Sequence, residues 1–325
     1  MKGIVRITAA ALLCATLFTG CGGMENKNSA VGFHMDTVIM LTGYCDEALL
    51  TDAIALCGRY EKLLSRTVEG SDVWKINHAG GDPVKISADT AKVLSLALDV
   101  CEKSGGALDI TIAPAVDLWD FKGEEPALPR DEDIAAAMEK VDYTKVMLEV
   151  DTVTIPKGME IDLGAVAKGY IADRAAEFLK ENGVQSAALN FGGNVIALGS
   201  KPDGSPWNIG IQDPNSQTGE SIAVVEVKDR SVVTSGVYQR GFDMDGIRYH
   251  HILDTDTGWP VQNGVSSVTI IAEGSARADA LSTACFAMGR DGLDFAREMG
   301  AEAVIVFSDG SIECTKGAEE LLVDG

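Results

Sequence analysis

Positively charged residues are scarce in this sequence of 325 residues, which holds 27 Lys and Arg against 49 Asp and Glu and has a net charge of −22. Nucleic-acid binding needs Lys and Arg gathered on one face, and no basic stripe is present, so this class of partner is excluded. A phosphorylated ligand would have to be held by something other than bulk charge. Hydrophobic residues make up 46% of the chain, which is enough to build a packed core.

Two common nucleotide-binding motifs are absent. The sequence contains neither G-x-G-x-x-G nor G-x-x-x-x-G-K-[ST], so Rossmann and P-loop nucleotide binding lose support. No Cys/His cluster has the spacing of a zinc site either.

The seven cysteines include no C-x-x-C pair. Cys14 lies in the N-terminal apolar run, and Cys21 follows that run. The other five lie mostly in apolar segments and are expected to be buried, reduced thiols, with a Cys45–Cys57 disulfide as the alternative. These five are Cys45, Cys57, Cys101, Cys285 and Cys314.

The N-terminus has the layout of a secretory signal. Lys2 and Arg6 precede the apolar run Ile7–Phe18, which at about 12 residues is too short to span a membrane. Residues 17–21 resemble the lipobox of bacterial lipoproteins, which implies that Cys21 is lipidated, for example with palmitate. We therefore expect a signal peptide at 1–20, a lipidated cysteine with a flexible tether at 21–30 and one functional domain at 31–325. The expected location is the extracytoplasmic side of the cell membrane; an ordinary cleaved signal is the alternative.

The rest of the chain predicts an α+β fold, because helices dominate its first half and antiparallel-type strands its second. The predicted helices are Asp46–Leu64, Ser87–Lys103, Asp131–Lys140, Ala165–Asn182, Ala276–Met288 and Leu293–Met299. The predicted strands are Gly32–Tyr44, Lys145–Val150, Thr152–Ile155, Ser186–Asn190, Val195–Leu198, Trp207–Ile211, Ile222–Val227, Ser231–Thr234, Arg248–Leu253, Val265–Ile271 and Ala303–Phe307.

The segment Asp162–Gly169 indicates an anion site. A strand-like approach ends at Gly164 and a helix starts at once, so free backbone N–H groups and the positive end of the helix dipole are available there. Lys168 lies one turn inside the helix, where it can reach a phosphate. Asp162 is placed to accept from a ligand, or else merely to cap the helix while Lys168 is solvated.

A second segment indicates a hard-metal site. Asp279 and Thr283 are four residues apart and share one helix face, with Ser282 adjoining. One carboxylate and one or two hydroxyls suit Mg²⁺, which takes substrate phosphates as further ligands. The alternative is that Asp279 only provides charge near a helix start and Thr283 only packs.

Two adjacent histidines, His250 and His251, lie on a predicted strand that runs into an Asp-rich turn. Successive strand residues face opposite sides, so at most one of the two can point into a given site. A histidine that is only hydrogen-bonded to the turn is the alternative.

Four segments together resemble the ApbE family of FAD:protein FMN transferases. The family patterns D-[LF]-[GS]-[AG]-x-[AG]-K-G, T-S-G-x-Y, H-x-[IL]-[DN]-P-x-T-G and A-D-A-x-[SD]-T-A occur in order at Asp162–Gly169, Thr234–Tyr238, His251–Gly258 and Ala278–Ala284. The resemblance covers residues 31–315. Thr255 replaces the family's proline, which is expected to loosen that turn, and Asp36 replaces its glycine.

The resemblance implies an ApbE-like fold with mixed or antiparallel sheets, flanking helices and a flavin cleft between two closely coupled subdomains. It implies FAD contacts at Met35, Thr67, Ala107, Leu108, Asp109, Asp162, Lys168 and Leu253. It also implies Mg²⁺ ligands at Asp279, Thr283, Ser282 and the backbone carbonyl of Ala165. His251 is the first candidate for proton transfer, and Asp279 or another nearby carboxylate is the alternative.

The activity that this resemblance implies is Mg²⁺-dependent transfer of FMN from FAD to a Thr or Ser hydroxyl of an acceptor protein, with release of AMP. Flavin-bearing subunits of membrane redox complexes are the implied acceptors, and a lipid anchor would place the enzyme beside them. The alternatives are an FAD pyrophosphatase that gives FMN and AMP, and a lipoprotein that binds flavin without catalysis.

Overall fold

The computed structural model describes residues 26–121, 127–216 and 220–323. The predicted signal peptide, Cys21 and residues 22–25 of the predicted tether lie outside the described residues. The predicted end of the tether at residue 30 is wrong, because the first strand already begins at Lys27. Every residue from Lys27 to His34 has a partner on the following strand, so residues 27–30 belong to the sheet.

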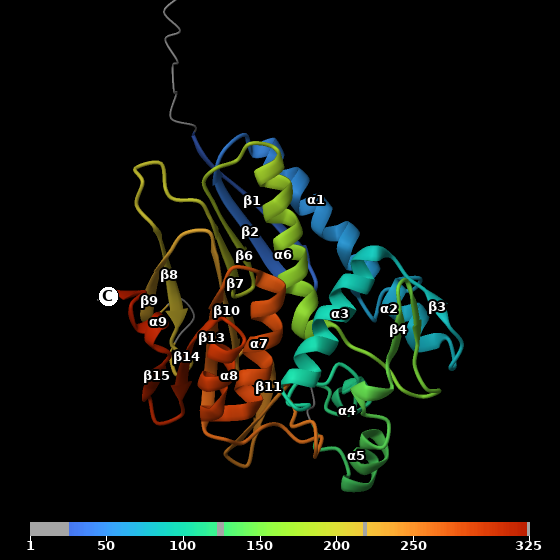
Figure 1. The fold of residues 1–325 in the computed structure, drawn as a ribbon. Helices are drawn as coiled ribbons and strands as arrows, with labels where there is room; N and C mark the ends of the chain where they lie inside the picture. The colour runs from blue at the N-terminus through green and yellow to red at the C-terminus, as the bar shows by residue number, and fades with distance from the viewer. Residues whose placement is uncertain (1–25, 122–126, 217–219, 324–325) are drawn as a thin grey trace, which may run out of the picture.

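An eight-stranded sheet with the order β1-β2-β6-β7-β10-β13-β14-β15 forms the centre of the molecule (Figure 1). All its neighbouring strands are antiparallel. Its strands are β1 (Lys27–His34), β2 (Thr37–Tyr44), β6 (Ala187–Phe191), β7 (Asn194–Leu198), β10 (Arg230–Gly236), β13 (Val265–Ala272), β14 (Glu302–Phe307) and β15 (Ile312–Cys314). β13 is buried at every position, as expected of a strand covered on both faces.

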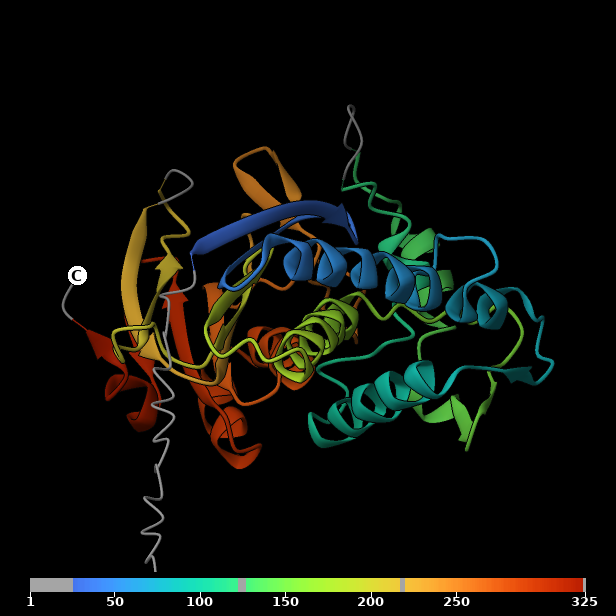
Figure 2. The ribbon, with the colours of Figure 1, turned by 90° about the horizontal axis from the view of Figure 1, so that it is seen from above.

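Helices cover one face of this sheet. α1 packs on β1 and β2, α6 on β6 and β7, and α7 on β10 and β13 (Figures 1 and 2). α3 joins them from the side, and α8 packs on β14. These helices are α1 (Glu47–Leu64), α3 (Ala88–Lys103), α6 (Gly164–Glu181), α7 (Ser275–Met288) and α8 (Gly292–Glu298).

A small antiparallel sheet of order β16-β9-β8 packs on part of the other face, as a second apolar cluster joins the two sheets. The cluster includes Trp207 and Val225 from the small sheet and Val232 and Ile271 from the large one. The elements are β8 (Trp207–Gln212), β9 (Ser221–Val227), α9 (Lys316–Glu319) and β16 (Leu322–Val323).

Most of the remaining elements lie beyond the ends of α1 and α6 and form the second part of the molecule (Figure 2). One apolar core runs through both parts, so they are closely coupled, as predicted. A separate aromatic cluster centres on the buried Trp119 and includes Phe242. The elements are α2 (Asp72–His78), β3 (Val84–Lys85), α4 (Ala113–Val116), α5 (Asp131–Met138), β4 (Met147–Glu149) and β5 (Thr152–Thr154), with a 3-10 turn at Tyr143–Lys145. A hairpin of β11 (Gly241–Met244) and β12 (Ile247–His250) follows β10, and a 3-10 turn at Gly289–Asp291 joins α7 to α8.

The predicted α+β class is confirmed, and one predicted strand is corrected. Gly32–Tyr44 is not a single strand but parts of β1 and β2, separated by a turn in which Met35 and Asp36 have φ values of 52° and 56°. No disulfide joins two cysteines of the described chain, so the alternative Cys45–Cys57 bridge is not formed. None of the helices within the described ranges is long and apolar enough to cross a bilayer.

Candidate active site

A cavity of about 760 Å³ lies between the two parts of the molecule, within the size range of small-molecule sites. Its walls come from the β1–β2 turn, the end of α1, the segment before α4, the first turns of α6, the ends of β10 and β12, and α7. All the predicted site residues in the described chain except Ser282 line it. They are Met35, Thr67, Ala107, Leu108, Asp109, Asp162, Ala165, Lys168, His251, Leu253, Asp279 and Thr283.

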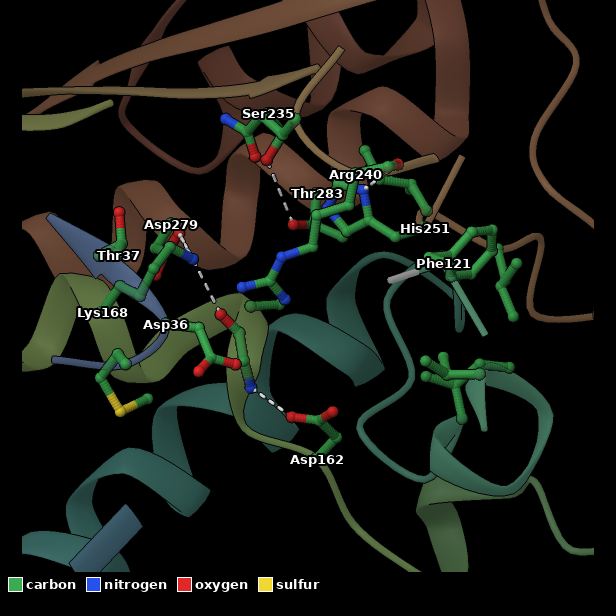
Figure 3. A pocket seen from close by; sticks show the side chains of 18 of the residues that line it. Asp36, Thr37, Phe121, Asp162, Lys168, Ser235, Arg240, His251, Asp279 and Thr283 are labelled. Carbon is green, nitrogen blue, oxygen red and sulfur yellow. Dashed lines mark hydrogen bonds and ion pairs between the residues drawn. The ribbon is translucent and has the colours of Figure 1, made fainter. Parts of the chain in front are cut away.

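The first turn of α6 forms one wall of the cavity (Figure 3). Asp162 lies just before the N-cap residue, Leu163, and its Oδ1 accepts from the N–H of Gly164, the first residue of the helix, at 2.7 Å. The other oxygen of Asp162 lies 2.9 Å from Nε of Arg66. Asp162 therefore bonds to the start of the helix and also holds a cation at the cavity wall, while its acceptance from a ligand stays a prediction.

Lys168 is not a solvated surface lysine. Its Nζ donates to the Gly164 carbonyl at 3.0 Å and lies 3.3 Å from Oδ1 of Asp279. The side chain is one-quarter exposed, on the cavity side. This contact brings together two predicted site residues that are 111 positions apart in the chain.

Asp279 and Thr283 lie one turn apart on α7 and both line the cavity. Asp279 is only 2% exposed, and its Oδ2 accepts from the Gly169 N–H at 2.9 Å. Ser282 is fully buried behind this wall. Its hydroxyl donates to the Asp279 carbonyl at 2.8 Å and lies 2.7 Å from Oγ of Ser235, so here it supports Ser235 and does not face the cavity.

The oxygen set at this wall suits a hard cation. No group of three or more His, Cys, Asp or Glu within the described residues has a metal-binding arrangement. Mg²⁺, however, is often bound by one or two carboxylates together with substrate phosphates and water. A single buried carboxylate, Asp279, with Thr283 one turn further along α7 and Ala165 on the wall of the same cavity, fits that pattern.

The two histidines face opposite sides, as predicted. His250 is buried against Phe286, with its Nε2 2.9 Å from the Val261 carbonyl. His251 lines the cavity, with its Nδ1 3.3 Å from the Arg240 carbonyl. Burial, followed by the positive charge of Arg240, lowers the pKa of His251 to about 3, so its imidazole is neutral at physiological pH.

Asp109 is held inside the protein by three hydrogen bonds. Its carboxylate accepts from the Thr111 N–H at 2.7 Å, the Thr111 hydroxyl at 2.6 Å and the Tyr143 N–H at 3.0 Å. Burial raises its pKa despite these bonds. Asp109 lines the cavity as predicted, but its described contacts fix the wall rather than leave both oxygens open to a ligand.

The two departures from the family pattern have structural explanations. Asp36 has a φ of 56°, a left-handed conformation in which glycine is favoured and Asp is tolerated. The Thr255 hydroxyl donates to the Gly106 carbonyl at 2.6 Å, next to Ala107 of the cavity wall. Asp254 further accepts from the N–H groups of Asp256 and Thr257. These bonds hold the turn in place, while a loosening relative to proline stays a prediction.

Several cavity residues are not predicted from the sequence. Arg66 makes a bidentate contact with Asp117 as well as its contact with Asp162, and the hydrogen bond to Asp117 is the largest cause of its raised pKa. The Arg240 side chain points into the cavity (Figure 3) and forms no ion pair with a described carboxylate. A lone arginine has no spacing signal, although Arg240 follows the T-S-G-x-Y segment by two residues.

Known proteins match this chain over most of its length. The model of the ApbE family matches residues 35–305. FAD:protein FMN transferase of Treponema pallidum is 36% identical over 83% of this chain and 80% of its own, and that of Klebsiella pneumoniae is 37% identical over 78% and 80%.

Solved structures agree with these matches. The ApbE protein of Thermotoga maritima superposes with a TM-score of 0.85 at 33% identity, over 92% of this chain and 100% of its own. The flavinyl transferase ApbE of Pseudomonas stutzeri gives a TM-score of 0.81 at 30% identity, over 92% and 98%. The ordered motifs, the fold and these matches agree: the chain belongs to the ApbE family.

Proposed function

We propose that this chain transfers FMN from FAD to a Ser or Thr hydroxyl of an acceptor protein and releases AMP. Membership of a family whose relatives are named FAD:protein FMN transferase supports a flavin transferase. The observation that carries the proposal is the meeting of Lys168 on α6 with Asp279 on α7 at one cavity wall, beside Thr283. This wall joins a cation, a helix N-terminus and a set of hard oxygen ligands, which is what a pyrophosphate requires.

The pyrophosphate is held by local positive groups in an otherwise acidic chain. The N-terminus of α6 carries the positive end of the helix dipole, and Lys168 lies within that helix on the cavity side. Arg240 adds a second positive charge from the opposite side of the cavity (Figure 3). These charges act in a partly enclosed site, where they are screened less than surface charges.

Mg²⁺ would be held by the Asp279 carboxylate, the Thr283 hydroxyl and the Ala165 carbonyl. When bound, Mg²⁺ would neutralise charge that develops on the phosphate oxygens. The Gly169 N–H and Lys168 hold the Asp279 carboxylate in place, so this ligand is oriented by the packing of α6 against α7.

The reaction is a displacement at phosphorus. The acceptor hydroxyl oxygen bonds to the phosphorus on the FMN side, and the bond from this phosphorus to the bridging oxygen breaks. AMP leaves with that oxygen, and the hydroxyl proton must pass to a base. His251 is our first candidate, because its side chain lines the cavity, and Asp279 is the alternative.

We further propose that the chain is anchored through lipidated Cys21 on the extracytoplasmic side of the cell membrane, where flavin-bearing subunits of redox complexes are its acceptors. The basic start, the short apolar run and the lipobox-like residues 17–21 support this. A Cys21→Ala variant should move from the membrane fraction to the soluble fraction, and retention of this variant in membranes would contradict the anchor.

Measurement of AMP tests the transfer directly. With FAD and Mg²⁺, AMP release should depend on the acceptor protein and should equal the FMN that becomes covalently bound to it. AMP released at the same rate without acceptor would identify a pyrophosphatase instead. Stable FAD retention with no AMP at all would identify a flavin-binding protein without this activity.

A further inference from the structure

An apolar patch lies on the outer face of the β1–β2 hairpin. Its four residues are Val31, Phe33, Val38 and Met40, which are 64%, 65%, 53% and 48% exposed. Only five other large apolar residues of the described chain are exposed, and they are spread over other segments: Leu128, Met147, Val150, Ile247 and Ile312. The exposed apolar surface is thus concentrated on this hairpin, and such concentrations mark interaction sites.

The register makes the patch continuous. Val31 lies directly opposite Met40, and Phe33 directly opposite Val38. Ile39, which lies between Val38 and Met40 on β2, is fully buried, so β2 is apolar on both faces at this point. A solvent-facing strand face is normally polar, and the four apolar side chains break this rule together.

No described element covers the patch. α1 packs on the opposite side of the hairpin, and β1 forms the edge of the large sheet (Figure 2). The small sheet packs on Ala188, Ala197, Val232 and other residues nearer the middle of the sheet, and its cluster includes none of the four patch residues.

The patch leads directly to the cavity. The turn that joins the two patch strands supplies Met35, Asp36 and Thr37 to the cavity wall. Thr37 also packs closely against the turn after β6. A Cβ added to Gly192 in that turn would lie 1.9 Å from the hydroxyl oxygen of Thr37. A molecule on the patch is therefore next to the cavity entrance.

We propose that this patch is the docking surface for the acceptor protein, an inference that rests on the proposed transfer of FMN. The acceptor must bring its hydroxyl into the cavity while the rest of its surface stays outside, and the patch is the apolar surface that adjoins the cavity. The partner is a folded protein that presents apolar side chains beside its hydroxyl residue. A patch of four residues suits a transient contact, since the modified acceptor must leave after each reaction.

The test compares a protein acceptor with a short peptide. Phe33→Thr and Met40→Thr remove apolar surface but keep residues that suit strands. The probes are a soluble flavin-carrying domain of a membrane redox complex and a five-residue peptide around its acceptor threonine. We expect the KM for the domain to rise about tenfold, the effect of losing about 1.4 kcal/mol of binding, with little change for the peptide.

Two further variants serve as controls for unfolding and for effects on activity that do not involve the patch. Val38→Thr is nearly isosteric and should raise the KM for the domain by a smaller factor. Ile312→Thr changes an exposed apolar residue on β15, at the opposite edge of the same sheet, and should leave the KM for the domain unchanged. Binding of FAD should be the same in all four variants.

The outcomes separate this proposal from the proposed function. Absence of FMN transfer to either probe by the unaltered chain would refute the function itself. Normal transfer with the same KM in patch and control variants would overturn the docking site. If Phe33→Thr and Met40→Thr lose binding to phospholipid vesicles but keep the KM for the domain, the docking site would also be overturned and the patch would be assigned to the membrane.

Discussion

At the scale of single residues, Asp279 illustrates what the structure adds to the sequence. The i, i+4 spacing with Thr283 predicts a shared helix face, and the structure places both side chains on the cavity. The sequence does not show that Lys168, 111 positions away, lies 3.3 Å from this carboxylate. Nor does it show that Ser282 turns toward Ser235, because the orientation of a buried hydroxyl depends on a strand from another part of the chain.

Replacement of Asp279 should abolish most transfer. Asp279→Asn keeps the size of the side chain but removes the negative charge that would bind Mg²⁺, so we expect the rate of FMN transfer to fall at least about 100-fold. Asp294→Asn, on the exposed face of α8, is the matched control and should keep full activity. Equal rates for the two variants would remove Asp279 from the site.

At the same scale, the pKa of His251 predicts how the stability of the fold depends on pH. Its folded pKa of about 3 lies below the usual 6.5, so between these values the unfolded chain binds more protons than the folded one. The contribution of His251 to the free energy of unfolding is therefore fully present above pH 6.5 and is lost as the pH falls toward 3. The limiting slope for one proton is about 1.4 kcal/mol per pH unit.

Urea denaturation of the unaltered chain and of His251→Gln at several pH values between 7 and 4.5 measures this contribution. The difference in unfolding free energy between the two proteins should shift as the pH falls, with the unaltered chain losing more. His78→Gln, at an exposed histidine, is the control. A difference that stays constant with pH, or that is the same for both variants, would contradict the lowered pKa of His251.

At the element scale, the crossing of α6 and α7 sets the site. A Cβ on Gly169 would lie 2.2 Å from the Ser275 carbonyl oxygen, so only glycine allows this approach. Asp173 accepts from the N–H groups of Ser275 and Ala276 at 2.8 and 2.9 Å, which ties α6 to the first turn of α7. The close approach also places the Gly169 N–H on Asp279.

Gly169→Ala should therefore destabilise the fold although alanine favours helices. Overpacking of this kind costs about 1–3 kcal/mol, so the melting temperature should fall by roughly 2–5 °C, and transfer should fall with it. Gly274→Ala is the matched control, because its nearest atom would be an ordinary 3.8 Å away. A Gly169→Ala protein that melts at or above the unaltered chain would contradict the importance of this contact.

The elements themselves were largely predictable. α1 and α3 begin one residue after the predicted helix starts at Asp46 and Ser87, whose side chains cap the helices by accepting from N–H groups of the first turns. The short elements α2, β3, β11 and β15 were not predicted, because seven residues or fewer give little periodicity. The turn at Met35 and Asp36 is not predicted for another reason: Asp36 suits a turn, but no Gly, Pro or Asn stands beside it, and Met35, which is not a typical turn residue, also adopts positive φ.

At the scale of the whole molecule, a net charge of −22 is compatible with a phosphate ligand because positively charged groups are gathered at the cavity. Lys168 and Arg240 line the cavity with the N-terminus of α6, and Arg66 is held there by Asp117 and Asp162. A metal ion on Asp279 would be consistent with the same account, since an acidic chain holds phosphate better through a cation than through its surface. The exclusion of nucleic acid as a partner stays a prediction from composition.

The covalent product gives the most direct test of the central claim. The chain is incubated with FAD, Mg²⁺ and the soluble flavin-carrying domain, and the intact mass of the domain is measured. We predict an increase equal to FMN less one water, located on a Ser or Thr, with one AMP released per FMN attached and neither product formed by Asp279→Asn. An unmodified domain in the presence of bound FAD, or modification that Asp279→Asn carries out equally well, would contradict it.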